Sequence, residues 1–164
     1  MLVQSRVNVV ACPLINSAMQ GRYDAWPKGR GIARVKDLWQ AGVNVSVAHD
    51  DIASPFYPLG SGNLLQAAWM NAHLSHMTGE EEIAESLRMV TTRAAETLRL
   101  GERYGLEVGR PASFVLFEAA KPLELLRLQP PCRYVFSRGR IVAETRPART
   151  VVAMDEAERE APTG

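Results

Sequence analysis

The spacing of apolar and polar residues predicts two β-strands in the first third of the chain. Residues 7–12 form a short apolar run that Pro13 ends, and residues 43–47 place a valine at every second position. Between them, residues 32–40 carry apolar side chains at helical spacing, and residues 15–31 read as a long, candidate functional loop. A strand, a helix and a second strand in this order predict two parallel, neighbouring strands.

The middle of the chain predicts helices. Residues 59–77 form one helical region, and residues 80–100 form another that is interrupted near Thr91. Thr78 followed three residues later by Glu81 predicts a capping box, with Thr78 as the N-cap of the second region.

From Gly105 onward the pattern changes to short strand-like runs. Arg138-Gly139 predicts a tight hairpin turn between the last two of them, and Val151-Val152 is compatible with one more short strand. The predicted runs are residues 114–117, 134–137 and 140–143. The predicted organisation is β/α units at 1–104, a β appendix at 105–153 and a disordered tail at 154–164.

Composition narrows the functional classes. The chain has 164 residues, 46% hydrophobic and 23% charged residues, and a net charge of +1. These values fit a globular protein and give no reason to expect nucleic acid or a membrane as partner. No apolar run has the length of a membrane span, and the amino terminus lacks a signal-peptide core. Cys12 and Cys132 lack metal-type spacing, so we expect small buried thiols in a reducing cytoplasm.

The most informative residues are His49-Asp50-Asp51, which end the second predicted strand. Pro55 and Pro58 prevent a regular element from following directly. In α/β barrels, polar groups at the carboxyl ends of strands carry the chemistry. A carboxylate there can bind a metal ion and take a proton from bound water. Asp is also common where a strand becomes a loop, so a cap or an Asx turn is the alternative.

Several segments together resemble the carboxyl-terminal part of bacterial-type cytosine deaminases, in the metal-dependent amidohydrolase superfamily. They are Asn8-Val-Val-Ala-Cys-Pro-Leu-Ile-Asn-Ser-Ala-Met-Gln-Gly-Arg22, Trp26-Pro-Lys-Gly-Arg-Gly-Ile32, Ala48-His-Asp-Asp51, Pro55-Phe-Tyr-Pro-Leu-Gly60, Thr91-Thr-Arg-Ala-Ala-Glu-Thr-Leu98 and Leu106-Glu-Val-Gly109. The resemblance implies an α/β fold: the last two β/α units of a TIM-type (β/α)8 barrel, followed by the carboxyl-terminal strands of a small β-sandwich.

The resemblance also implies residue roles. Asp50 matches the aspartate that binds one divalent metal ion, iron or zinc, and acts as base for the attacking water. Asp51 matches a carboxylate that lines the substrate pocket. Phe56 stands where the family has a tryptophan packing against the pyrimidine. The implied reaction is deamination of a small pyrimidine-like substrate, cytosine to uracil plus ammonia. The sequence leaves open whether the ring is cytosine, a creatinine-like lactam or a triazine.

Other polar residues have structural interpretations at least as strong. We expect His49 to point away from Asp50 and to pack. His73 and His76 have a spacing that can bind metal, but no third ligand accompanies them. Packing is the simplest role for the tryptophans, which are Trp26, Trp39 and Trp69. Loop structure is the simplest role for Asn16 and Gln20, and solvent contact is the simplest role for Arg22 and Arg30.

One aspartate cannot hold a catalytic metal, and the chain has no His-x-His pair. Two parallel strands also do not close a barrel, and they leave strand edges exposed. We therefore expect a natural fragment, a mis-called start or a split subunit that is inactive alone. Its expected partner is a missing amino-terminal barrel half, or another copy bound through exposed strand edges. The alternatives are a non-catalytic amidohydrolase remnant or interaction module, and a small independent α/β binding protein.

Overall fold

The computed structural model describes residues 2–148. The strand expected at Val151-Val152, the end of the β appendix and the tail from residue 154 lie outside the described residues.

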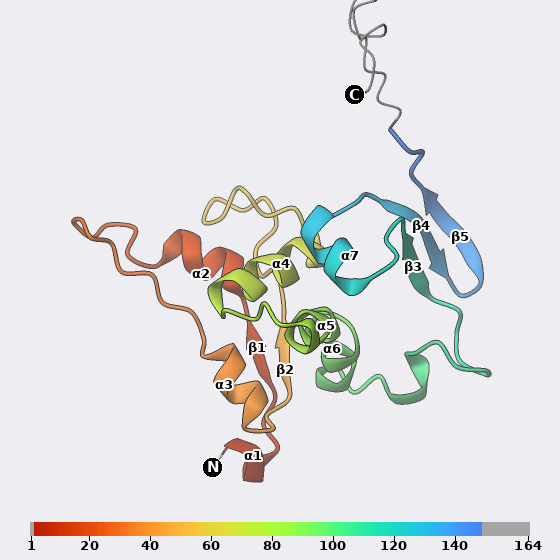
Figure 1. The fold of residues 1–164 in the computed structure, drawn as a ribbon, viewed down its shortest axis with the longest axis horizontal. Coiled ribbons are helices and arrows are strands. Elements are labelled where there is room, and N and C mark those ends of the chain that lie inside the picture. The colour runs from red at the N-terminus through yellow and green to blue at the C-terminus, as the bar shows by residue number, and fades with distance from the viewer. Residues whose placement is uncertain (1, 149–164) are drawn as a thin grey trace, which may run out of the picture.

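Two parallel strands lie at the centre of the β/α part, as the sequence predicts. Strand β1 (Val9–Ala11) pairs with β2 (Val45–Val47), in a register that places Val9 opposite Val45 and Ala11 opposite Val47. All residues of β2 are buried, because helices pack against it. The chain crosses from β1 to β2 through α2 (Pro13–Met19) and α3 (Val35–Gln40) (Figure 1).

The expected loop at residues 15–31 is wrong in its first part. Helix α2 begins at Pro13 and continues to Met19, and Pro13 and Leu14 are buried. Proline is tolerated there because the first amides of a helix have no intrahelical acceptor. The irregular connection begins at Gln20 and continues until α3 begins at Val35.

The predicted helices of the middle are confirmed, but the first is shorter than the expected residues 59–77 and one cap differs. The elements are α4 (Leu64–Leu74), α5 (Glu80–Met89) and α6 (Thr92–Thr97), with the expected interruption at Thr91. The N-cap of α5 is Gly79 rather than Thr78. Glu82, not Glu81, therefore occupies the N3 position and accepts the Gly79 amide hydrogen at 2.9 Å. The acidic side chains in a row at 80–82 made this shift of one residue invisible in the pattern.

The carboxyl-terminal region forms an antiparallel sheet in the order β3-β4-β5. Its strands are Phe114–Phe117, Cys132–Ser137 and Arg140–Glu144. Arg138 and Gly139 join the last two with positive φ angles of 49° and 78°, as a type I′ hairpin turn requires. Figure 1 shows this sheet to one side of the β1–β2 pair.

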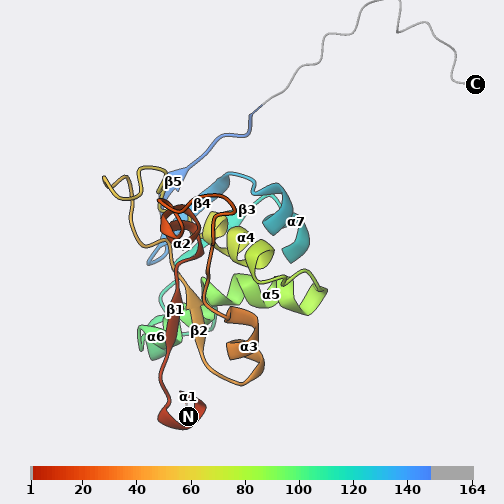
Figure 2. The ribbon, with the colours of Figure 1, turned by 90° about the vertical axis from the view of Figure 1, so that its left-hand side faces the viewer.

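Besides α2, three further short helices in the described residues were not predicted. They are α1 (Leu2–Ser5), the 3₁₀ helix η1 (Gly101–Arg103) and α7 (Pro122–Leu128). Helix α7 buries Leu126 against α4 and α5, and so joins the β appendix to the rest of the chain (Figure 2).

The larger core lies around β1 and β2. Its buried members include Val35, Val45, Val47, Met77 and Met89. Trp39 and Trp69 pack against the two core clusters, as expected. The packing role expected for Trp26 is wrong, because that side chain is 81% exposed.

Candidate active site

The carboxyl ends of β1 and β2 form one edge. The Ala48 amide donates to the Ala11 carbonyl at 2.9 Å, so the two chains stay paired for one residue beyond the strands. Cys12 follows Ala11 and precedes α2, while His49 and Asp50 follow Ala48. Cys12 and Asp50 therefore lie at the same edge of the sheet, where parallel α/β folds place their binding sites.

Asp50 leaves the strand in a strained direction. Its φ angle is 68°, in the left-handed region that Asp tolerates better than most residues. The residue is exposed, and in the part of the chain that the structure describes its carboxylate makes no hydrogen bond or ion pair. The charge that the sequence analysis singles out is therefore available to a ligand.

Asp51 is held within its own loop. The Ser54 hydroxyl donates to Asp51 Oδ2 at 2.6 Å, and the Tyr57 amide donates to the Ser54 hydroxyl at 3.1 Å. One Asp51 oxygen thus serves the loop structure, although its donor is a side-chain hydroxyl and not the backbone amide that defines an Asx turn. Its role in lining a substrate pocket stays a prediction.

His49 faces inward, on the opposite side of the strand end from Asp50. It is 4% exposed, and its ring lies 6.1 Å from that of Tyr57. Its Nδ1 atom lies 3.1 Å from the Asp51 carbonyl oxygen, and its Nε2 atom accepts the Ser61 amide hydrogen at 3.3 Å. His49 is therefore a packing residue with two backbone partners.

The same loop carries the aromatic candidate. Phe56 is 67% exposed, while its neighbour Tyr57 is 6% exposed. Tyr57 anchors the loop in the larger core, so the phenyl ring of Phe56 is free to contact a ligand.

The other polar candidates do not join Asp50 in a ligand set. His73 donates from Nδ1 to the Trp69 carbonyl at 2.8 Å and packs on the Trp69 ring at 4.1 Å. His76 lies beyond the end of α4. In the connection after α2, the Gln20 side chain accepts the Gly31 amide hydrogen at 2.6 Å, and Arg30 donates to the Ser17 carbonyl at 3.1 Å. Gln20 and Arg30 thus structure that connection.

The described residues do not complete a metal centre. Among residues 2–148, no group of three or more His, Cys, Asp and Glu side chains is placed to hold a metal ion. The free carboxylate of Asp50 fits the role of one ligand, but zinc and iron sites need three or four protein ligands.

Cys12 is a neighbour of Asp50 that the sequence analysis did not place in the site. Burial raises the pKa of the Cys12 thiol, and the negative charge of Asp50 raises that pKa further. The thiol is therefore protonated at neutral pH. The parallel pairing of the two strands was the signal for this proximity, because it brings residues 12 and 50 to one edge.

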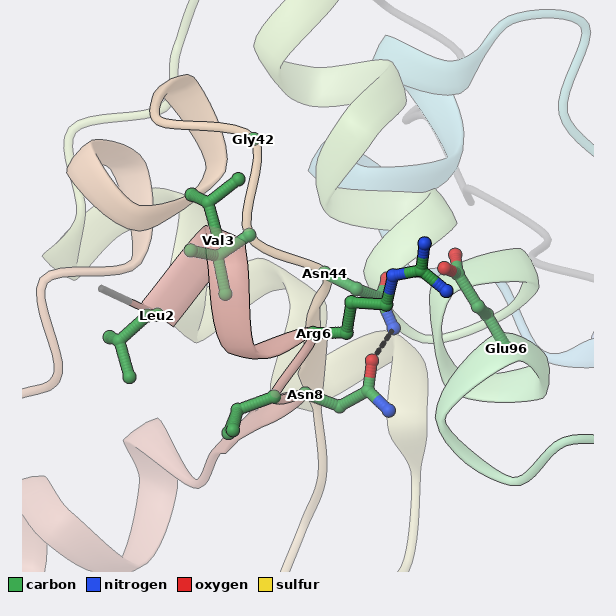
Figure 3. A pocket seen from close by; sticks show the side chains of 9 residues that line it. Leu2, Val3, Arg6, Asn8, Gly42, Asn44 and Glu96 are labelled. Atoms are coloured by element: carbon green, nitrogen blue, oxygen red, sulfur yellow. Dashed lines mark hydrogen bonds between the residues drawn. The ribbon is translucent and has the colours of Figure 1, made fainter.

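A pocket of about 200 Å³ lies at the other end of the strands. It is lined by α1 and by residues just before β1 and β2, among them Arg6, Asn8 and Asn44 (Figure 3). Asn44 Nδ2 donates to Asn8 Oδ1 at 3.0 Å. Asn8 precedes β1 and Asn44 precedes β2, whereas Asp50 follows β2. This pocket therefore lies at the opposite end of the strands from the candidate site.

Comparison with known proteins decides the family. The model of the family described as "Amidohydrolase family" matches residues 1–143 of this chain. The chain belongs to the amidohydrolase family. Its structure is similar to that of 5-methylcytosine deaminase from Klebsiella pneumoniae liganded with phosphonocytosine, with a TM-score of 0.83 and 36% identity. That similarity covers 89% of this amidohydrolase chain and 36% of the Klebsiella chain.

Two further relatives act on other rings by their names. Pterin deaminase from Rhizobium rhizogenes is 28% identical over 148 residues, which are 90% of this chain and 33% of that protein. An adenosine deaminase from Xanthomonas campestris, solved with bound zinc, is 23% identical with a TM-score of 0.65 and shares the fold. The chain spans about a third of the length of these relatives. None of the helices in the described part of this chain has the length and apolar character that a membrane crossing requires.

Proposed function

We propose that this chain supplies the carboxyl-terminal β/α units of a metal-dependent deaminase that removes the amino group from a pyrimidine-like ring, with cytosine as the first candidate. The observation that carries the proposal is the free Asp50 carboxylate at the carboxyl end of a buried parallel strand. The likeness to a 5-methylcytosine deaminase over 89% of this chain supports the ring class.

Each site residue has a distinct task in this proposal. Asp50 would hold one position of a divalent metal ion, and that ion would supply an activated water. The Asp50 carboxylate would accept a proton from this water. The Phe56 ring offers a flat apolar face for the substrate, and Asp51 borders the same loop.

The proposal also includes a partner, because the remaining ligands must come from polypeptide outside residues 2–148. The two-stranded sheet of β1 and β2 has unpaired outer edges within the described residues. Val10 on β1 is 51% exposed, although strands of a closed parallel barrel are covered on both faces. Further barrel strands, in the same chain or in a separate subunit, would pair with these edges and complete the metal centre.

A chimera tests this function. The chain replaces the matching 36% of the Klebsiella 5-methylcytosine deaminase, so that the Klebsiella part provides the remaining barrel. We expect the chimera to bind a divalent metal and to release ammonia from cytosine or 5-methylcytosine. Asp50→Asn in the chimera should abolish ammonia release, and the chain alone should show none.

Three results would contradict the proposal. Ammonia release by the metal-loaded chain alone, lost on Asp50→Asn, would show that the chain carries a complete centre. A folded chimera whose metal content and turnover ignore Asp50→Asn would remove Asp50 from the site. A folded chimera that binds no metal favours the non-catalytic alternative.

A further inference from the structure

The loop that carries Asp51 and Phe56 is closed at its base by one buried side chain. His49 comes before the loop, yet its ring contacts the backbone at both ends of it, at Asp51 and at Ser61. We infer that His49 is a positioning residue, which fixes the loop at residues 51–61 through two hydrogen bonds that need one tautomer of its imidazole.

The backbone partners determine that tautomer. The Ser61 amide can only donate, so Nε2 of His49 must carry a lone pair. The Asp51 carbonyl can only accept, so Nδ1 must carry the proton. Both bonds are satisfied together only by the neutral ring with its proton on Nδ1.

The surroundings leave this arrangement little freedom. The ring is 4% exposed, so an unmade hydrogen bond would not be replaced by water at little cost. The two ends of the loop also approach closely, because the Ala53 amide donates to the Gly60 carbonyl at 3.1 Å. A side chain at Gly60 would collide with the Asp51 carbonyl, which is the same group that His49 holds.

The consequence for catalysis rests on the proposed function. Asp50 lies between His49 and the loop that His49 holds, and it has a φ angle of 68°. The direction of its carboxylate is therefore determined by the peptide groups on either side. Loss of the His49 bonds should misplace Asp50 and Phe56 together, and small displacements of reacting groups lower turnover strongly.

Three substitutions separate the two bonds. His49→Gln places an amide oxygen near the Nε2 position and can still accept from Ser61. His49→Asn places an amide nitrogen near the Nδ1 position and can still donate to Asp51. His49→Phe makes neither bond.

The measurement is amide hydrogen exchange of Ser61 in the full chain, followed by NMR. We expect His49→Asn and His49→Phe to speed Ser61 exchange about tenfold, as the loss of one hydrogen bond predicts, and His49→Gln to restore most of the protection. Exchange of the Ile83 amide, which is bonded in α5, reports whether each variant is folded. His73→Gln on the exposed side of α4 is the matched control and should leave Ser61 unchanged.

The unsubstituted chain provides a second test, which does not depend on variant folding. The imidazole nitrogen-15 spectrum should show His49 protonated at Nδ1 and bare at Nε2. A proton on Nε2, or equal Ser61 exchange in the Gln, Asn and Phe variants, would overturn the inference.

Turnover of the chimera separates this inference from the proposed function. His49→Gln should keep most of kcat, and His49→Asn should lose about tenfold or more at unchanged metal content. If the chimera is inactive while the exchange and tautomer results hold, the proposed function fails and the positioning role stands.

Discussion

The Arg93 guanidinium donates to a carboxylate oxygen of Glu85 at 2.7 Å, and the Glu85 side chain is 3% exposed. Arg88 binds the other Glu85 oxygen at 3.0 Å. The Arg93 carbonyl in turn accepts from the Asn44 side chain, which lies just before β2. Glu85 on α5 is thereby linked through α6 to β2, the strand that precedes Asp50.

The two arginines should differ in their effect on stability. Arg93→Met leaves the buried Glu85 carboxylate with one partner and should lower the free energy of unfolding by about 3 kcal/mol. Arg88→Met should cost about 1 kcal/mol, because the Arg88 side chain is 52% exposed and water screens its charge. Urea unfolding followed by circular dichroism measures both. Equal losses would contradict the assignment of Arg93 as the main partner.

A second ion pair predicts acid sensitivity. Lys36 on α3 lies 2.5 Å from Glu82 on α5. The hydrogen bond from Lys36, followed by the bond from the Gly79 amide, lowers the pKa of Glu82. Because the pKa is lowered, ionised Glu82 stabilises the fold at pH values above 4.5, its pKa in the unfolded chain. This contribution is lost as the pH falls through the lower pKa of the folded state.

Lys36→Met should therefore flatten the dependence of stability on pH in the acid range. The measurement is the urea midpoint from neutral pH to well below 4.5, the range in which folded Glu82 takes up its proton, for the unsubstituted chain and the variant. Arg34→Met is the matched control, because the Arg34–Asp37 pair is exposed and lies within α3. A similar loss of pH dependence in that control would show that the removal of any positive charge has this effect, and that the Lys36–Glu82 pair is not responsible.

Sequence reasoning succeeded where one local pattern determined one element. The alternating valines at 43–47 and the apolar face of residues 32–40 were sufficient for the β1–β2 pairing, because side chains of a buried strand must face two packed layers. Helix α2 was missed because Pro13 reads as a breaker, although it is compatible with a first helical turn. Helix α7 was missed because its stability comes from burying Leu126 against distant helices.

Some features of the candidate site follow from the sequence pattern, and others do not. Asp50 and its exposure follow from the strand pattern, and the inward direction of His49 follows from alternation. The bonds of His49 to Asp51 and Ser61, and the approach of Cys12 to Asp50, depend on the three-dimensional path of a loop and of a neighbouring strand. No periodicity in the sequence encodes either contact.

The Cys12 thiol should report on the charge of Asp50. Burial is the larger cause of its raised pKa, and Asp50 is the second. Asp50→Asn should therefore lower the pKa of Cys12 but leave it above the ordinary value of 9.0. The measurement is the rate of iodoacetamide labelling against pH, in a Cys132→Ser background. An unchanged labelling profile would show that the two groups do not interact.

This thiol also predicts a change of stability at alkaline pH. Because the folded pKa is raised, the contribution of Cys12 is fully present below the unfolded value of 9.0 and is lost as pH rises toward the folded value. Cys12→Ala should remove that alkaline dependence. Cys132→Ala is the control on the β4 strand.

Asp50 and Phe56 should fail in different ways in the active chimera. In the proposed function Asp50 acts on the attacking water, so Asp50→Ala should remove nearly all turnover and weaken metal binding. In the same proposal Phe56 only stacks on the flat ring of the substrate, and losing one stacking face should cost about 1–3 kcal/mol. Phe56→Ala should therefore raise KM, leave the metal content unchanged and retain turnover at saturating substrate. Phe56→Trp should be tolerated, because the indole keeps an aromatic face.

The structure adds a control to this comparison. Phe56 is 67% exposed, so Phe56→Ala should lower the unfolding free energy of the chain by no more than about 0.5 kcal/mol. Asp50→Ala should lower it by about 1 kcal/mol, because alanine tolerates the Asp50 φ angle of 68° less well than aspartate does. Tyr57→Ala should behave differently, because Tyr57 is 6% exposed and belongs to the larger core. Steady-state kinetics, metal analysis and urea unfolding on the same variants separate these cases. If Asp50→Ala kept its metal and most of its kcat, or if Phe56→Ala lost its metal, the roles assigned to these two residues would be wrong.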